Sequence, residues 1–211
     1  PLAVLAILIA SGVALFEQNI KRLLAYSSIA QIGYILLGAS FVTVAGLTAS
    51  TVHLFNHALA KGALFLAVGC LATSCMGLRL SDLGGVAKRM PWTAAAFVVA
   101  GFSLIGIPGT AGFISKWYLI TAALEQGALG VALVIVLVIS SLMAAVYIWR
   151  VVEAIYFAEP ASDLSAVREA PPMMLAVTWV AALANLYFGI APDVPLTLAA
   201  SAAETLLEHL P

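Results

Sequence analysis

Long runs of apolar residues dominate the chain, and short polar stretches separate them. A transmembrane helix needs about 20 predominantly apolar residues. The runs predict six membrane spans, at residues 2–16, 23–42, 46–75, 91–124, 127–149 and 172–191. No basic region precedes the first run and no cleavage-site pattern follows it, which is typical of a shortened span and not of a signal peptide. The chain starts at Pro1, and we expect it to be a fragment of a longer protein.

The fourth run is too long for one straight helix. Residues 91–124 would extend about 50 Å as a helix, well beyond a hydrocarbon core of about 30 Å. The run contains the stretch IGIPGTAGF, in which Pro108 and Gly109 should interrupt the helical hydrogen bonds. Two interpretations fit this pattern: two short spans, or one span whose helix is broken.

The distribution of basic residues decides between these interpretations. If the fourth span is a single broken helix, three loops lie on the same side of the membrane, and they hold seven of the nine Lys and Arg residues: Lys21, Arg22, Arg79, Lys88, Arg89, Arg150 and Arg168. The opposite loops hold none, as the positive-inside rule favours. Two short spans would instead move Arg150 and Arg168 to the other side. We therefore predict an all-α, multi-pass protein of the cell (inner) membrane, with six transmembrane helices and cytoplasmic basic loops.

The last 19 residues differ from the spans. We expect residues 1–192 to form the membrane domain and residues 193–211 to form an amphipathic tail. Its stretch LTLAASAAETLLEHLP is apolar on one side and carries Glu204, Glu208 and His209 on the other. Such a helix is expected along the outer membrane surface or against a neighbouring subunit.

Composition agrees with a membrane location and excludes several functions. The chain is 64% hydrophobic and 9% charged, whereas a soluble domain has about 25% charged residues. The net charge of −1 indicates no nucleic-acid partner. Cys70 and Cys75 match no zinc or haem spacing and are expected to be packing residues. The chain has no nucleotide-binding loop and no nucleophile motif, so we expect no cofactor, no metal and no catalytic residue.

Titratable residues inside the third and fourth spans are the candidates for function. His53, His57 and Lys61 follow one another in steps of four and share one side of a helix. A charge at mid-bilayer costs at least about 3 kcal/mol, so these residues should face a polar interior. A lone histidine could simply join two helices, but three titratable groups in line favour a function. Lys116 follows the predicted break by about two turns, and breaks of this kind mark ion sites in transporters. The alternative is that Lys116 extends outward toward Glu125.

These residue types can carry protons. A lysine in apolar surroundings can release its proton readily, and neutral histidines can accept protons between two lysines. The pattern predicts a proton relay through Lys116, Lys61, His57 and His53. Polar residues nearby are candidates to support it, with helix packing as an equal alternative: Tyr26, Ser27, Ser28, Gln31 and Ser115.

Three stretches together resemble the antiporter-like membrane subunits shared by respiratory complex I and Mrp-type multisubunit cation/proton antiporters: NIKRLLAYSSIAQIGYILLG, HLFNHALAKGALFLAVG and IPGTAGFISKWYL. The resemblance covers nearly the whole chain. It implies the last six helices of a fourteen-helix fold, including the second of two inverted five-helix repeats. The family's central Lys or Glu on the broken helix corresponds to Lys116, and its connecting Lys and His correspond to Lys61, His57 and His53. The family usually has Pro where this chain has Gly109.

The resemblance also implies a function. The stretches MPWTAAAFVVAGFSLIGIPGTAGFISKWYL and YFAEP are more similar to the D-type subunit of Mrp antiporters than to complex I. They imply a transporter subunit that moves protons in exchange for Na⁺, with other membrane subunits as partners. The alternative is a proton-pumping subunit of NADH:quinone oxidoreductase or a related hydrogenase, without a redox site of its own. A third possibility is a membrane scaffold in which the titratable residues only join helices. The family's first-repeat residues would lie upstream of Pro1, so this fragment alone should not transport.

Overall fold

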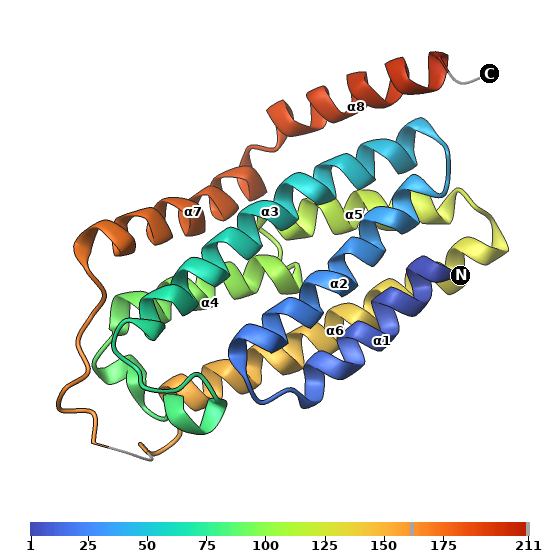
Figure 1. Cartoon of the computed structure of the whole chain (residues 1–211). Helices are drawn as coiled ribbons and strands as arrows, with labels where there is room; N and C mark the ends of the chain where they lie inside the picture. The colour runs from blue at the N-terminus through green and yellow to red at the C-terminus, as the bar shows by residue number, and fades with distance from the viewer. Residues whose placement is uncertain (161–162, 210–211) are drawn as a thin grey trace.

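The computed structural model describes residues 1–160 and 163–209. Its α-helices are α1 (Leu2–Phe16), α2 (Ile20–Ala39), α3 (Val44–Ala72), α4 (Pro91–Ile105), α5 (Ala111–Leu124), α6 (Ala128–Tyr156), α7 (Pro172–Ile190) and α8 (Asp193–Glu208), with short 3-10 helices η1 (Leu80–Leu83) and η2 (Val86–Lys88). The helices run roughly along one axis, and α4 and α5 follow each other end to end (Figure 1). The predicted fold class is confirmed: an all-α membrane bundle whose fourth span is interrupted. By length and composition α3, α6 and α7 can each cross a membrane, while α1, α4 and α5 are shorter apolar helices.

The break between α4 and α5 is built from three residues. Gly106 ends α4 in the left-handed conformation, with φ 90°, and its N–H donates to the Phe102 carbonyl. Pro108 and Gly109, with φ 87° at the glycine, then form a turn of the type II residue pattern. The N–H of Thr110 closes this turn on the Ile107 carbonyl at 3.2 Å. The sequence predicted Pro108 and Gly109 as the break but gave no indication of Gly106.

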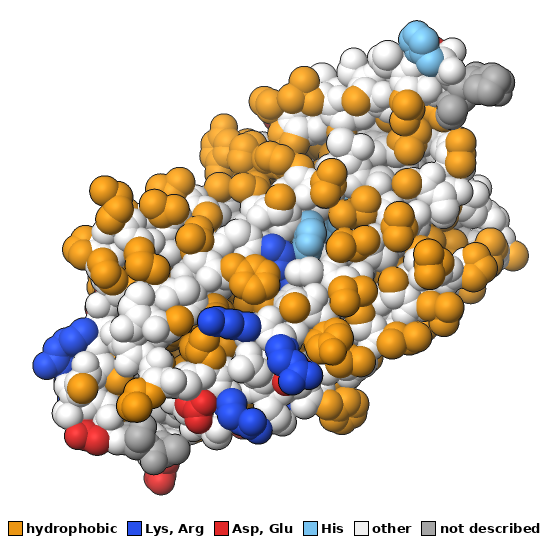
Figure 2. Space-filling model, in the orientation of Figure 1, with side chains coloured by type: hydrophobic (Ala, Val, Ile, Leu, Met, Phe, Trp, Pro, Cys, Tyr) orange, Lys and Arg blue, Asp and Glu red, His pale blue; other side chains and the backbone are white. Residues whose placement is uncertain are grey.

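Helix α3 lies at the centre of the bundle, in contact with α2, α4, α5, α7 and α8. The apolar core forms two clusters. One includes Leu24, Leu64 and Phe97, and the other includes Ile7 and Leu119. Large apolar side chains also cover the outside, as expected for a surface in contact with lipid (Figure 2).

Three polar segments meet at one end of the bundle, where the chain reverses between α1 and α2, α3 and α4, and α6 and α7 (Figure 1). The backbone N–H of Ile20 donates to the Leu78 carbonyl at 3.0 Å, and the N–H of Leu80 donates to the Gln18 carbonyl at 2.9 Å. These bonds fasten the first segment to the second. All the basic residues predicted to be cytoplasmic lie in or next to these segments.

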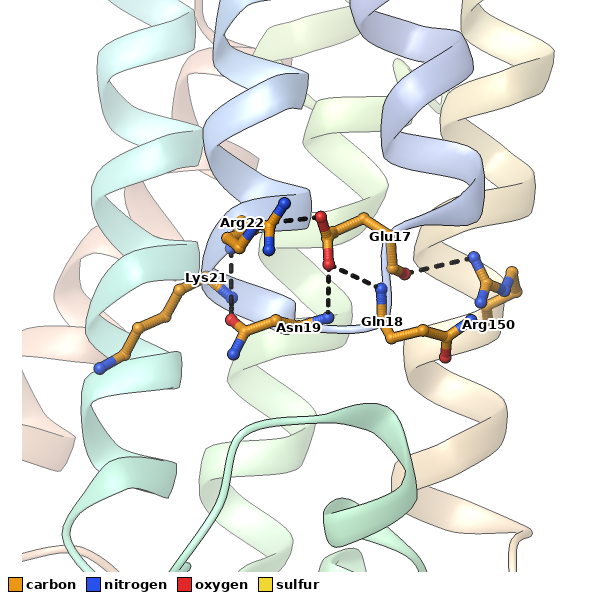
Figure 3. Close-up of polar contacts among 6 residues, drawn as sticks. All are labelled: Glu17, Gln18, Asn19, Lys21, Arg22 and Arg150. Carbon is orange, nitrogen blue, oxygen red and sulfur yellow. Dashed lines mark hydrogen bonds and ion pairs between the residues drawn. The ribbon is translucent and has the colours of Figure 1, made fainter.

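Side chains strengthen the same region (Figure 3). The Glu17 carboxylate accepts from the backbone N–H groups of Gln18 and Asn19 and pairs with the Arg22 guanidinium at 3.1 Å. From α6, Arg150 donates to the carbonyls of Leu15 and Glu17, which lie at the C-terminus of α1.

Helix α8 follows α7 and packs against α3, with Ala199 and Ala203 buried (Figure 1). Residues 193–208 lie against α3 of the same chain, and the predicted position along the outer membrane surface or on a neighbouring subunit stays a prediction. Residues 210–211 of the predicted tail lie outside the described residues. At the end of α7, Gly189 approaches the backbone of Gly109 and Thr110 so closely that a Cβ atom would have no space.

Candidate functional site

Buried polar residues form a layer across the middle of the bundle, between the two apolar clusters. On α2 they lie between Leu24 and Tyr34, on α3 between Ala49 and Ala63, and on the broken span between Ala100 and Leu119. The layer includes Ser27, Gln31, His53, Asn56, Lys61, Ser103, Thr110, Ser115, Lys116 and Ser140. An uncompensated polar group in such a place is costly, so its partners decide what the layer can do.

Lys116 points back toward the helix break. Its Nζ donates to the carbonyls of Leu104 and Ile105, at 3.1 and 2.8 Å, and to Ser141 Oγ at 3.0 Å. The last carbonyls of a helix have no partner within that helix, so the break leaves these acceptors free for the lysine. The ammonium also lies 5.3 Å from the centre of the Tyr34 ring. The alternative orientation toward the outer end of α5 is therefore not the one observed.

His53 joins three helices. Its Nδ1 contacts Ser115 Oγ on α5 at 2.9 Å, and its Nε2 contacts Gln31 Oε1 on α2 at 3.0 Å. Its ring stacks on the Tyr34 ring, with 5.2 Å between the ring centres. Because Ser115 precedes Lys116 on α5, this contact brings the histidine next to the lysine-bearing helix.

His53, His57 and Lys61 form a column of titratable side chains along one face of α3. The ring of His57 is nearly parallel to that of His53, with 6.4 Å between centres. The Nζ of Lys61 donates to the Leu24 carbonyl at 2.8 Å and to Ser27 Oγ. His57 is partly exposed. Figure 2 shows a histidine next to a basic side chain among apolar side chains in the middle of the face, while further charged side chains gather toward the lower left.

A small cavity of about 10 Å³ separates the column from Lys116. Its lining residues come from four elements: Gln31, His53, Asn56, His57, Ala60, Ser103, Leu104, Gly112, Ser115 and Lys116. Asn56 donates to the Ala111 carbonyl at 2.6 Å, while its Oδ1 and His57 Nδ1 have no partner among the described residues. Buried polar atoms of this kind commonly bind an internal water, and a volume of about 10–15 Å³ is enough for one. A proton could cross this gap through such a water.

The supporting residues divide into two groups. Ser27, Gln31 and Ser115 contact the lysines or histidines directly, as described above. Ser28 donates to Leu24 of its own helix, and Tyr26 packs against the apolar core. Three further residues of the site were not predicted from the sequence: Tyr34, Asn56 and Ser141. Of these, only Asn56 had a usable signal, since it follows His53 by three residues on the same helix face.

Within residues 1–160 and 163–209, no group of three His, Cys, Asp or Glu residues is placed to hold a metal ion. The polar side chains of the described layer carry lysine amines, imidazoles, amides and hydroxyls. These groups donate, accept and exchange protons.

Comparisons with known proteins place this geometry in context. Residues 1–144 match the family model described as NADH:quinone oxidoreductase/Mrp antiporter, TM. NADH-quinone oxidoreductase subunit N of Desulforudis audaxviator is 45% identical over 172 residues, which are 81% of this chain and 34% of the relative. The Mrp complex of Dietzia sp. contains a chain with a TM-score of 0.89 and 27% identity, over 97% of this chain and 46% of that one. A chain of the membrane-bound sulfane sulfur reductase, an archaeal respiratory membrane complex, has a TM-score of 0.82 and 37% identity. The match covers 89% of this chain and 31% of that one. This chain therefore spans less than half the length of each of the three.

Proposed function

Because the chain belongs to the NADH:quinone oxidoreductase/Mrp antiporter membrane family, we propose that it is part of a subunit that moves protons through the membrane. One observation carries this proposal: two lysines and two histidines lie in or beside the polar layer, and within residues 1–160 and 163–209 the hydrogen-bond partners of these side chains are neutral groups. Permanent charges on these side chains inside the membrane would carry a high free-energy cost. Groups that take up and release protons explain the arrangement better than fixed structural cations.

The path that we propose runs from Lys61 through His57 and His53 to Lys116. Ser27 holds Lys61 at one end, and Ser115 joins His53 to the lysine-bearing helix at the other. The carbonyls freed by the helix break stabilise Lys116 when it carries a proton. When Lys116 loses that proton, its neutral amine is a weaker donor to these carbonyls. The stability of the helix break therefore depends on the charge on Lys116.

We infer that the subunit works in a redox-driven complex of the quinone oxidoreductase type, located in the cell membrane with other membrane subunits as partners. The sequence motifs alone favoured the D-type component of Mrp antiporters, but the 45% identity to NADH-quinone oxidoreductase subunit N supports the alternative that they left open. An Mrp-type Na⁺/proton antiporter is the second candidate, since a chain of the Dietzia Mrp complex matches with a TM-score of 0.89.

The test is Lys116→Arg in the full-length protein within its assembled complex. Arginine can still donate to the carbonyls at the break, but it stays protonated in proteins and cannot act as a relay. We expect proton transport to fall by about 100-fold, the lower end of what a positioned proton-transfer group contributes. Transport is measured as pH-gradient formation in membrane vesicles, and assembly is checked on native gels.

Two companion variants sharpen this test. Lys116→Glu should retain more transport than Lys116→Ala, because a carboxylate can still exchange a proton. Near-normal transport in assembled Lys116→Arg would contradict the relay. The type of complex is tested separately: a pH gradient driven by NADH supports the oxidoreductase, and a gradient collapsed by added Na⁺ supports the antiporter.

A further inference from the structure

The first turn of α4 is capped by a side chain from a distant segment. Pro91, the first residue of the helix, has no N–H, and the side chain of Met90 before it is apolar. The carboxylate of Glu169, in the segment between α6 and α7, supplies the cap. One of its oxygens accepts from the backbone N–H groups of Trp92 and Thr93, at 2.9 and 3.4 Å, and the other accepts from Thr93 Oγ1 at 2.5 Å. Three donors at the start of α4 therefore share one carboxylate.

Hydrogen bonds and burial also fix the segment that carries Glu169. The backbone N–H of Ala170 donates to the carboxylate at 3.1 Å, and the hydroxyl of Ser74, just after α3, donates to the Arg168 carbonyl at 2.8 Å. Val167 and Ala170 are buried. This short segment joins the end of α3 to the start of α4, directly before α7 begins. All these contacts are between atoms of this chain, so they do not depend on what covers the outside of the bundle.

The other end of α4 holds Lys116. The carbonyls of Leu104 and Ile105, the last two residues of the helix, accept from the Lys116 ammonium. The 15 residues of α4 extend over about 22 Å. The helix thus has a carboxylate at its N-terminus and an ammonium at its C-terminus, which is the favourable arrangement of charges for a helix dipole. Both charges come from other segments, so α4 connects the two.

The position of α4 along its axis depends on these polar bonds. In a membrane, contacts between apolar helices replace contacts with equally apolar lipid, so close packing and interhelical hydrogen bonds determine how helices associate. Thr93 is 0% exposed, and without Glu169 its N–H and hydroxyl would lose their acceptor. They reach water only if the start of α4 moves toward the polar end of the bundle or unwinds. Movement of the whole helix would draw the carbonyls of Leu104 and Ile105 away from Lys116.

We propose that Glu169 is a positioning residue for the proton relay. Its carboxylate holds α4 in place so that the last two carbonyls of this helix meet Lys116, about 22 Å from the cap. The residue acts through α4 and not by contact with the path. The inference rests on the proposed function in predicting an effect on transport, whereas its prediction for the position of α4 is tested without transport.

Transport by variants of the full-length protein in its assembled complex tests this role. Glu169→Ala removes the acceptor and should lower proton transport roughly 10- to 100-fold, since a displacement of about 1 Å can cost about 100-fold. Glu169→Gln should retain most transport, because its amide oxygen accepts from the Trp92 N–H and its amide NH₂ group donates to Thr93 Oγ1. Glu159→Ala removes a carboxylate of the same segment but none of the three bonds at the start of α4. It is the matched control and should transport normally.

Amide hydrogen exchange, measured by mass spectrometry on the same complexes, separates a displaced helix from a frayed one. The N–H groups of Gly106 and Ile107 both donate to the Phe102 carbonyl at the break, at 3.0 Å. If α4 moves, Glu169→Ala should increase exchange at residues 92–95 and also at these two amides, whereas fraying changes the first set alone. Glu169→Gln should give nearly wild-type rates at the break.

Two results would contradict the positioning role: normal transport in assembled Glu169→Ala, or exchange that changes only at residues 92–95. Either would show a cap that stabilises the helix end and positions nothing beyond it. If Glu169→Ala does not assemble, Thr93→Val replaces it, since it removes one of the three donors at nearly the same size.

The two measurements also distinguish this inference from the proposed function. Changed exchange at the break in Glu169→Ala, in a complex whose wild type moves no protons, would contradict the proposed function alone. Unchanged exchange at the break in Glu169→Ala, in a complex whose wild type transports, would contradict the positioning role alone.

Discussion

Single glycines at the broken span serve two different purposes. Gly109 has φ 87°, and a Cβ atom added to it would meet no other atom within 4 Å, so only its backbone conformation requires glycine. Gly112 has an ordinary φ, but a Cβ atom there would collide with the Ser103 carbonyl. We therefore expect Gly109→Ala to cost about 1–2 kcal/mol of unfolding free energy. Gly112→Ala should cost more, because backbone cannot move aside easily.

Thermal unfolding of the purified variants in detergent measures this difference. We expect the wild type to have the highest melting temperature, Gly109→Ala a lower one and Gly112→Ala the lowest. Gly62→Ala is the control, since nothing lies near its added Cβ atom and its backbone is helical. A melting temperature for Gly112→Ala equal to the control would show that α4 and α5 are free to separate.

The hydroxyl groups around the column offer a second test at the residue scale. Ser115→Ala removes the hydroxyl that contacts His53 Nδ1 and leaves this buried nitrogen without that partner. We expect the free energy of unfolding to fall by about 1–3 kcal/mol. Proton transport in vesicles should fall as well, because the bridge from α3 to α5 is lost. Ser28→Ala is the matched control, since that hydroxyl bonds within its own helix. Equal effects of the two changes would argue against the bridge.

The sequence could predict only part of this site. Steps of four residues placed His53, His57 and Lys61 on one face, because helix periodicity acts within a single element. Tyr34 and Ser141 could not be found in the same way. They approach Lys116 from α2 and α6, and the crossing of helices distant in sequence leaves no local pattern.

At the scale of elements, residues near the helix ends explain why predicted spans and observed helices differ. The fifth span was expected to end at residue 149, but α6 continues to Tyr156. Arg150 and Glu153 end the apolar stretch without ending the helix, since both are tolerated in a helix and lie where the bundle becomes polar. The third span was expected from residue 46, and α3 begins at Val44 because Thr43 accepts from the Gly46 N–H as its N-cap.

The stability of the segment between α1 and α2 should depend on pH. Backbone N–H groups, first that of Asn19 and then that of Gln18, with Arg22 nearby, hold the pKa of Glu17 below its ordinary value of 4.5. A lowered folded-state pKa contributes stability above pH 4.5, and this contribution is lost as the pH falls through the lower value. We expect amide hydrogen exchange in residues 17–20, corrected for the intrinsic rate, to increase below pH 4.5. Glu17→Gln should remove this pH dependence, and an unchanged profile would contradict the role of the carboxylate.

At the scale of the whole molecule, the ends of the bundle differ in charge, and this difference predicts the orientation. The segment that contains η1 and η2 carries Arg79, Lys88 and Arg89 and should be cytoplasmic. A cysteine at the exposed Ser81, in a variant with Cys70 and Cys75 replaced, should be inaccessible to impermeant maleimide in intact cells and react after permeabilisation. Ready labelling in intact cells would reverse the topology.

The contact of Arg150 with the end of α1 has a consequence for biosynthesis. The guanidinium and the Leu15 carbonyl that it binds are 135 residues apart in the chain. At a synthesis rate of about 5–20 residues per second, the arginine leaves the ribosome roughly 7–27 s after its partner. During that interval water or the insertion machinery must satisfy the last carbonyls of α1. Helix α1 therefore obtains its final hydrogen bonds only after α6 has been synthesised and inserted.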